Sequence, residues 1–229
     1  MVSQLRSFLQ FAPLERKLRQ LQNKGADWNW KARLLALAST PYIDFEIAKA
    51  RQYFATDPDP ANLRDCLTLV TSGTKSTKEL TKENLLEIHS VLEKNGSGRK
   101  GAFRTGPAPS ICEGHQPLEA QAVSLAFDRL FEWIASDAFA EMHPIEQMTL
   151  CQLRLYEIWP FESQSGLAGD FFALLVLYQG KGLLPLFSPE DSPAFSEALS
   201  DAFNFVTKPL VDFNLKGCER ACDEALKLI

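Results

Sequence analysis

The sequence has few residues that would serve a metal site or a disulfide framework. Its only three histidines are His89, His115 and His143, and its five cysteines are odd in number and widely spread. Such a set argues against paired disulfides, and free cysteines are most often core residues. Cys218 and Cys222 lie four residues apart, but no histidine has ligand spacing to them. We therefore predict free thiols, no metal site, and a reducing compartment that we take to be the cytoplasm.

The chain also lacks an excess of positive charge and any long apolar run. It has 24 basic and 29 acidic residues and a net charge of -5. This balance lacks the excess of positive charge that indicates nucleic-acid binding. No apolar run reaches the roughly 18 residues that a membrane span requires. The N-terminal segment MVSQLRSFLQFAPLERKLRQ is amphipathic and charged, without a signal-peptide cleavage pattern. We expect neither nucleic acid nor a membrane among its partners.

Apolar residues at helical spacing dominate what is present. With 45% hydrophobic and 23% charged residues, the 229-residue chain has the composition of a soluble globular protein. Pro13 is expected to interrupt the first helix, and Ser39-Thr40-Pro41 to stop or kink the second. Thr81 and His143 are expected to begin helices. The periodicity predicts helices at residues 3–24, 28–39, 42–55, 61–72, 117–136, 145–158, 166–180, 189–204 and 207–229, and one starting at 81.

One stretch breaks the helical pattern. Residues 99–116, RKGAFRTGPAPSICEGHQ, contain three glycines and two prolines. Short strand-like pieces at 102–104 and 110–112 flank a turn, which predicts a small β-hairpin. The fold class is therefore all-α with one hairpin.

The segment from Tyr156 to Gln179 is the most distinctive in the chain. Trp159-Pro160-Phe161 leads into a short polar loop, and Gly166 and Gly169 then open a strongly apolar run. This order predicts a loop, a tight turn and a buried helix for which Ser165 is a candidate N-cap. The first amides of a helix have no partner within it, so this turn is a candidate anion site.

This segment resembles the signature of the Fic (Fic/Doc, or Fido) family, HPFx(D/E)GNGRxxGR. Typical members transfer AMP from ATP to a protein hydroxyl with magnesium. The resemblance implies a Fic-type helical bundle with one small β-hairpin flap. The matching positions are Pro160, Phe161, Gly166 and Gly169.

Most reactive positions of the signature differ. Trp159 stands at the general-base histidine, and Ser163 at the acidic magnesium ligand. Gln164-Ser165 replaces the Gly-Asn pair of the phosphate-binding turn. Leu167 and Asp170 replace the two phosphate-binding arginines. An indole nitrogen only donates, and Asp170 would repel a triphosphate. The resemblance therefore implies that the proline, phenylalanine and glycine frame of the signature is present and that its reactive side chains are absent.

The resemblance extends beyond the signature, over roughly residues 30–187. Gly101-Ala102-Phe103-Arg104 is similar to the family's G-x-(F/Y)-R, which opens the flap that aligns a target's main chain. His143-Pro144-Ile145 and Leu183-Leu184-Pro185 are similar to elements before and after the signature. We divide the chain into an N-terminal helical region (1–78), a Fic-like core (79–187) and C-terminal helices (188–229), packed as one unit.

Residues 38–45 resemble the family's N-terminal inhibitory motif, (S/T)xxxE(G/N). Thr40 and Asp44 stand at its hydroxyl and glutamate positions, and Phe45 at the last one. In members with this helix the glutamate occupies the second signature arginine. The resemblance therefore places Asp44 against Asp170, where the two would form a like-charge pair.

Several residues keep two interpretations. Trp159 is either a pocket plug or a stacking platform for a ring. Glu162 is either a solvated turn carboxylate or a displaced metal ligand, and Arg104 either aligns a peptide or bonds to the motif loop. The degenerate nucleotide or anion site comprises Glu162, Ser163, Gln164, Ser165, Gly166, Leu167, Gly169 and Asp170.

Two functions follow from this resemblance. The first is a catalytically inactive binding or regulatory protein, with a protein partner or a homodimer left open and no cofactor. The alternative is a divergent protein adenylyltransferase, or a transferase that uses another phosphate-containing donor. ATP and magnesium enter only through the resemblance.

Overall fold

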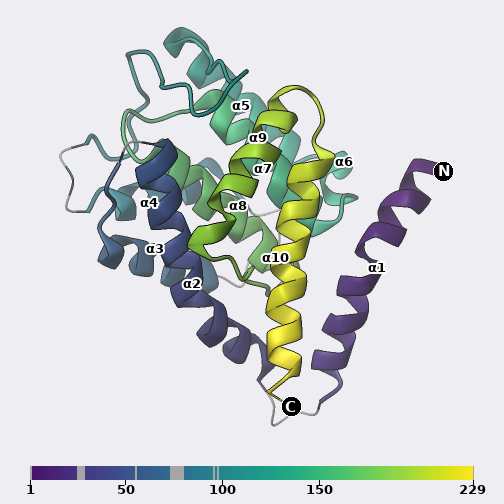
Figure 1. Cartoon of the computed structure of the whole chain (residues 1–229). Helices are drawn as coiled ribbons and strands as arrows, with labels where there is room; N and C mark the ends of the chain where they lie inside the picture. Colours follow the sequence, from purple (N-terminus) through teal and green to yellow (C-terminus); the bar gives the residue numbers. More distant parts are fainter. Residues whose placement is uncertain are drawn as a thin grey trace.

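The helical spacing of apolar residues produces an all-α architecture (Figure 1). The computed structural model describes residues 2–24, 29–54, 56–72, 80–94, 96 and 98–228, with side chains from residue 9 onward. The elements are α1 (Val2–Gln22), α2 (Trp30–Tyr53), α3 (Pro60–Ser72), α4 (Lys82–Leu92), η2 (Ala120–Ala122), α5 (Val123–Ile134), α6 (Asp137–Ala140), α7 (Pro144–Ile158), α8 (Ser165–Lys181), η3 (Pro189–Asp191), α9 (Ser192–Phe203) and α10 (Lys208–Leu226).

Helix α8 lies at the centre of the bundle. Every residue from Ser165 to Leu177 is buried, as expected for a helix that is apolar on all sides. Helix α7 packs along it, and α2, α3 and α4 contact it as well. The turn between α7 and α8 is therefore held on several sides by other helices.

Two prolines lie inside helices that the sequence predicted to be broken. Helix α1 continues through Pro13, and α2 continues through Pro41, so the predicted break at Pro13 and the predicted stop at Pro41 are wrong. A proline inside a helix costs about 3 kcal/mol, but tertiary packing supplies most helical stability. Both halves of α2 bury residues, from Leu34 before the proline to Ala50 after it.

Helix α1 packs along α10, beside which it is drawn in Figure 1. Its buried side chains are Phe11, Leu14, Leu18 and Leu21. The Phe11 ring also stacks on His143 at 3.9 Å, and Lys17 pairs with Asp223 at 2.8 Å. One hydrophobic cluster runs from Phe11 to Ala225.

The predicted hairpin at 99–116 is not formed. Within the described residues, the β pairing is a single antiparallel bridge between Phe103 and Phe161, and the Arg104 N–H donates to Pro160 O at 2.9 Å. Pro107 and Pro109 have no N–H to donate to a second strand. The segment therefore runs along the turn between α7 and α8 instead of folding back on itself.

The helix starts were predicted with mixed success. The predicted caps are confirmed: the Thr81 N–H donates to Asn84 Oδ1, and His143 Nδ1 accepts from the Ile145 N–H. The N-cap of α8 is Gln164, not Ser165. The predicted linker at 73–79 lies outside the described residues. Among the helices that are described, none is long and apolar enough to cross a membrane.

Candidate functional site: the turn between α7 and α8

Trp159 terminates α7 with a left-handed backbone, φ 45° and ψ 65°. Such a conformation costs a bulky residue on the order of 1–3 kcal/mol, so surrounding contacts must hold it. The side chain is 4% exposed, and its ring centroid lies 5.5 Å from that of Phe54 and 6.2 Å from that of Tyr156. The indole is thus embedded in the core.

Phe54, at the end of α2, lies against the first turn of α8. A Cβ on Gly166 would come 2.5 Å from Phe54 Cε2, a distance that side chains do not tolerate. Gly169 allows a second close approach, since a Cβ there would lie 3.1 Å from Leu155 Cβ. Both signature glycines therefore serve contacts within this chain. The Phe54 ring therefore fills the space directly beside the Cα of Gly166.

The loop before α8 is fixed by its own polar groups. Gln164 has a left-handed backbone (φ 53°), and its carbonyl accepts from the Ala168 N–H at 2.8 Å. Ser165 is buried, and its Oγ accepts from the Phe161 N–H at 3.1 Å. The serine hydroxyl therefore closes the loop, which explains why it is not the cap of α8.

Ser163 hydrogen-bonds to a buried carboxylate that the sequence did not single out. Its Oγ donates to Glu93 Oε1 at 2.5 Å, and Glu93 Oε2 accepts from the Gly98 N–H at 3.2 Å. Glu93 is buried at the end of α4. The carboxylate thus ties the segment after α4 to the turn before α8.

His89 supports the same loop from α4. Its Nδ1 accepts from the Gly101 N–H at 3.0 Å, so Nε2 carries the proton and donates to Ser163 O at 3.2 Å. The ring stacks on Phe161 at 3.9 Å. Burial lowers the pKa of His89, which favours the neutral ring that these bonds require.

Glu162 is the exposed residue of the loop. Its Oε1 accepts from Thr105 Oγ1 at 3.2 Å. Within the described part of the chain, no group of three His, Cys, Asp or Glu side chains is arranged to hold a metal ion. The contacts of Glu162 are those of a turn carboxylate at the surface.

Asp170 has three polar partners on two other helices. Its Oδ2 lies 2.7 Å from Lys49 Nζ in α2, and neither side chain has any exposed surface. Its Oδ1 accepts from Gln152 Nε2 at 2.7 Å and from the Tyr156 hydroxyl. The position of the second signature arginine is thus held by a carboxylate that two helices saturate.

Lys49 has a second carboxylate partner on its own helix, Glu46, at 2.8 Å. Burial, followed by the Asp170 carboxylate, raises the pKa of Glu46 to about 8. Burial alone would lower the pKa of Lys49, but the charges of Asp170 and Glu46 outweigh it and raise that pKa. At neutral pH the carboxyl group of Glu46 therefore favours its protonated, neutral form.

Aromatic rings surround the ammonium group of Lys49. Its Nζ lies 4.7 Å from the ring centroid of Phe195, 5.0 Å from that of Phe45 and 6.0 Å from that of Phe54. Cation–π contacts of this kind strengthen when water is excluded. Lys49 therefore joins α2, α8 and α9 at a single buried point.

Solved structures match the fold of this chain over nearly its whole length. Fic-1 from C. elegans has a TM-score of 0.79 and 12% identity, with coverage of 100% of this chain and 73% of that chain. A Fic domain containing signaling protein from Bacteroides thetaiotaomicron has a TM-score of 0.71 and 16% identity, covering 95% and 96%. A Fic family protein from Desulfovibrio desulfuricans has a TM-score of 0.63 and 15% identity, covering 96% and 74%.

This chain has the Fic fold. Identities of this size show the fold alone, and no protein-family model matches the sequence. Within the Fic fold, the turn between α7 and α8 carries the signature frame, and α2 covers it.

The predicted contact between Asp44 and Asp170 is not formed. Asp44 is exposed on α2, whereas Asp170 is fully buried and meets Lys49 of the same helix. The helix of this Fic fold that was expected to place a carboxylate at the signature therefore places an ammonium group there. The physical reason is the register of α2: its buried stripe is Tyr42, Phe45, Glu46 and Lys49.

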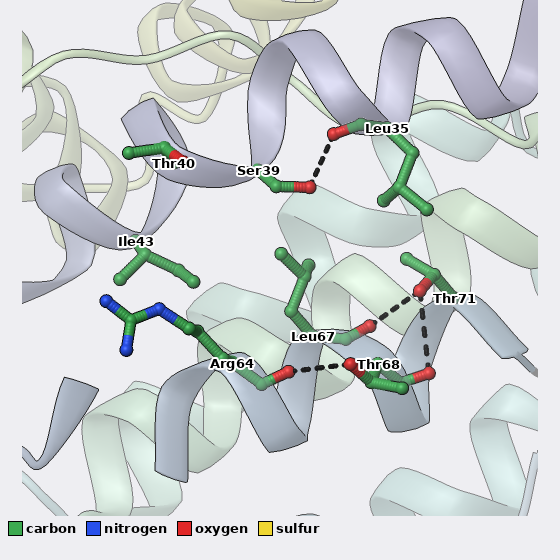
Figure 2. Close-up of a pocket in the computed structure, with 8 residues that line it drawn as sticks. All are labelled: Leu35, Ser39, Thr40, Ile43, Arg64, Leu67, Thr68 and Thr71. Carbon is green, nitrogen blue, oxygen red and sulfur yellow. Dashed lines mark hydrogen bonds between the residues drawn. The ribbon is translucent and has the colours of Figure 1, made fainter. Parts of the chain in front are cut away.

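Thr40 also lies away from the turn. It lines a pocket of about 190 Å³ between α2 and α3, together with Arg64 and Thr71 (Figure 2). The Thr71 and Thr68 hydroxyls donate to carbonyls of their own helix, Leu67 O at 2.8 Å and Arg64 O at 2.9 Å. These hydroxyls are therefore already committed within α3.

Arg104 is buried, and its guanidinium faces backbone carbonyls. Nε donates to Trp159 O and Nη1 to Gly106 O, each at 2.7 Å, and Nη2 donates to Leu118 O. A cation at the last carbonyls of a helix is favoured by the helix dipole. Arg104 thereby closes the end of α7, and Phe103 forms the bridge to Phe161.

Several residues of the site were missed from the sequence, among them Glu46, Lys49, Phe54 and Glu93. For two of them a signal was present, because Glu46 and Lys49 share an apolar helical stripe with Tyr42 and Phe45. Charged residues on such a stripe are rarely buried without partners. Phe54 and Glu93 follow the ends of helices, where periodicity gives no direction.

Proposed function

We propose that this chain is a Fic-fold binding or regulatory protein that does not transfer AMP. The observation that carries the proposal is Asp170, which lies fully buried, 2.7 Å from Lys49, at the position of the second signature arginine. An arginine there would grip a phosphate through bidentate hydrogen bonds. A carboxylate repels that phosphate. The Asp170 carboxylate also already has its polar partners within the chain, Lys49, Gln152 and Tyr156.

The general-base position supports the same proposal. Trp159 stands where the signature has histidine, and its indole N–H can only donate. General-base assistance contributes typically ~10²–10⁴ in rate, and nothing at this position supplies it. The indole packs between Phe54 and Tyr156, so it also takes the room of an approaching hydroxyl group.

The phosphate-binding turn supports it as well. Leu167 replaces the first signature arginine and is fully buried. The Phe54 ring lies against Gly166, where a bound anion would have to reach the first amides of α8. Displacing that ring would uncover Lys49, which packs beneath it.

A transfer assay tests the proposal. The full chain is incubated with ATP labelled on the α-phosphorus, with magnesium or manganese, alone and with a mixture of candidate target proteins. An active Fic-family adenylyltransferase serves as the positive control. We expect no label on any protein. Label that appears on this chain or on a target, and that survives removal of free nucleotide under denaturing conditions, would overturn the proposal in favour of a divergent transferase.

A further inference from the structure

A groove between α5 and α7 lies apart from the turn described above. Its volume is about 810 Å³, and its lining is mainly apolar. The apolar side chains include Leu125, Ala126, Leu130 and Trp133 from α5, and Leu150 from α7. Residues 159–166, which form the turn itself, do not line the groove.

The two walls carry side chains at helical spacing. Helix α5 buries Val123, Phe127 and Ile134 on its inner side, while Leu125, Arg129 and Trp133, which line the groove, recur every four positions. On α7 the lining residues are 150, 154 and 157. Paired stripes of this kind form the walls into which a third helix can pack.

The groove is long enough for a short helix. The Leu118 N–H, just before α5, donates to Glu157 O near the end of α7, at 3.0 Å. The beginning of one wall therefore lies beside the end of the other. From Ala122 to Trp133 the wall extends about 17 Å at 1.5 Å per residue, which is three helical turns.

Two leucines of the groove are open to solvent. Leu125 is 56% exposed and Leu118 is 38% exposed, both on the wall of the same groove. Contiguous exposed apolar surface rimmed by charged residues marks interaction sites on soluble proteins. Scattered exposed leucines elsewhere, such as Leu9 on α1, have no such setting.

The charges at the groove indicate which partner fits. Arg129 stands on one wall and Arg154 on the other, with Glu157 as the acidic lining residue. Arg154 pairs with Glu157 at 2.6 Å, whereas Arg129 forms no ion pair with any described residue. The lining is thus net positive on a chain whose net charge is -5. A carboxylate on the partner would meet Arg129.

We propose that this groove binds an amphipathic helix of another protein, about three turns long. Its apolar side chains, at i, i+3 or i+4, and i+7, fill the space between Leu125, Trp133 and Leu150. An acidic side chain on its flank pairs with Arg129. This inference goes beyond the proposed function and does not depend on whether nucleotide binds.

A displayed peptide library tests this interaction. The library holds 14-residue helices with leucine at the three buried positions and Glu, Lys, Gln or Ala at the flanking positions, and it is selected on the full chain. We expect enrichment of Glu at one flank. For enriched peptides, Leu125→Glu should weaken binding by about 30-fold or more, and Arg129→Glu by about tenfold. Changing the peptide's Glu to Lys should restore binding to the Arg129→Glu variant.

Leu9→Glu is the matched control, since Leu9 is an exposed leucine on α1, outside the groove. We expect it to leave peptide binding unchanged, with circular dichroism checking that all variants fold. The proposal fails if no peptide is enriched, if enriched peptides bind Leu125→Glu as well as the natural chain, or if lysine is selected at the flanks. A concentration-dependent dimer that Leu125→Glu dissociates would assign the groove to a second copy and also overturn it. Label in the AMP-transfer assay would remove the proposed function and leave these outcomes unaffected.

Discussion

Lys49 concentrates the energetics of the site in one side chain. It is fully buried, and its ammonium contacts two carboxyl groups and three aromatic rings. A buried pair often contributes little net stability compared with an apolar replacement of both partners. Removing one partner alone has a much larger effect, because it leaves the other charge buried without compensation.

We predict that Lys49→Met lowers the free energy of unfolding by about 3–5 kcal/mol, because it leaves the Asp170 carboxylate unpaired. Adding Asp170→Asn should recover part of that loss, and urea denaturation of the four combinations measures the coupling. Lys94→Met is the control, since Lys94 forms an exposed pair with Asp65 at 2.9 Å and should cost less than about 1 kcal/mol. Equal losses for Lys49→Met and Lys94→Met would refute the role given to Lys49.

Glu46 makes the stability of the chain depend on pH in a defined direction. Folding raises the pKa of its carboxyl group from 4.5 to about 8. The stability contributed by this proton is fully present below pH 4.5 and is lost as the pH rises through about 8. A glutamine side chain cannot ionise, so Glu46→Gln should remove this dependence of the unfolding free energy on pH.

The predicted outcome is that the variant gains stability over the natural chain as the pH rises from 5 to 8, and that the difference then levels off. Denaturation midpoints across this range measure it. Asp44→Asn provides the control, because Asp44 is exposed on the same helix. Parallel pH profiles for Glu46→Gln and the natural chain would contradict this account of the cluster.

At the scale of elements, the contact between α2 and α8 depends on a glycine. Gly166 admits the Phe54 ring at a distance where a Cβ would clash. We predict that Gly166→Ala destabilises the chain by about 1–3 kcal/mol, as overpacking does. In a Phe54→Ala background the clash is absent, and the same substitution should stabilise α8 by roughly 1 kcal/mol through helix propensity.

Thermal or urea unfolding of the four proteins tests this reversal of sign. Gly106→Ala is a suitable control, since a Cβ there would meet nothing within 4 Å and should change stability little. A Gly166→Ala effect of the same sign and size in both backgrounds would mean that Phe54 is not what fills the space over the turn.

The sequence predicted the elements that carry the signature better than those that cover it. Helix α7 was predicted at 145–158 and begins one residue earlier, at Pro144. The prediction was this close because the His143-Pro144 cap is a local signal in the sequence. The prediction of the hairpin failed because the Arg104 side chain donates hydrogen bonds to the carbonyls of Trp159 and Leu118, which lie further along the chain. No local sequence pattern reports such contacts. Pro41 misled the prediction of α2, since burial on both sides of it outweighs the local cost.

At the scale of the whole molecule, the helices form a Fic fold in which the buried charged cluster of Glu46, Lys49 and Asp170 joins α2 to α8. The resemblance correctly indicated the fold, which solved Fic structures share with this chain at 12–16% identity. It misplaced Asp44, because the register of a helix decides which side chain reaches the core. The partner of Asp170 could only be found from the packed structure.

Titration of the full chain with magnesium ATP in an isothermal calorimeter tests the central claim most directly. The account predicts a dissociation constant above about 1 mM, which means a binding free energy weaker than about −4 kcal/mol. The reason is that the turn offers a phenyl ring and a carboxylate where a phosphate would lie. A dissociation constant in the micromolar range, with the nucleotide competing against the contact between Phe54 and Gly166, would contradict it.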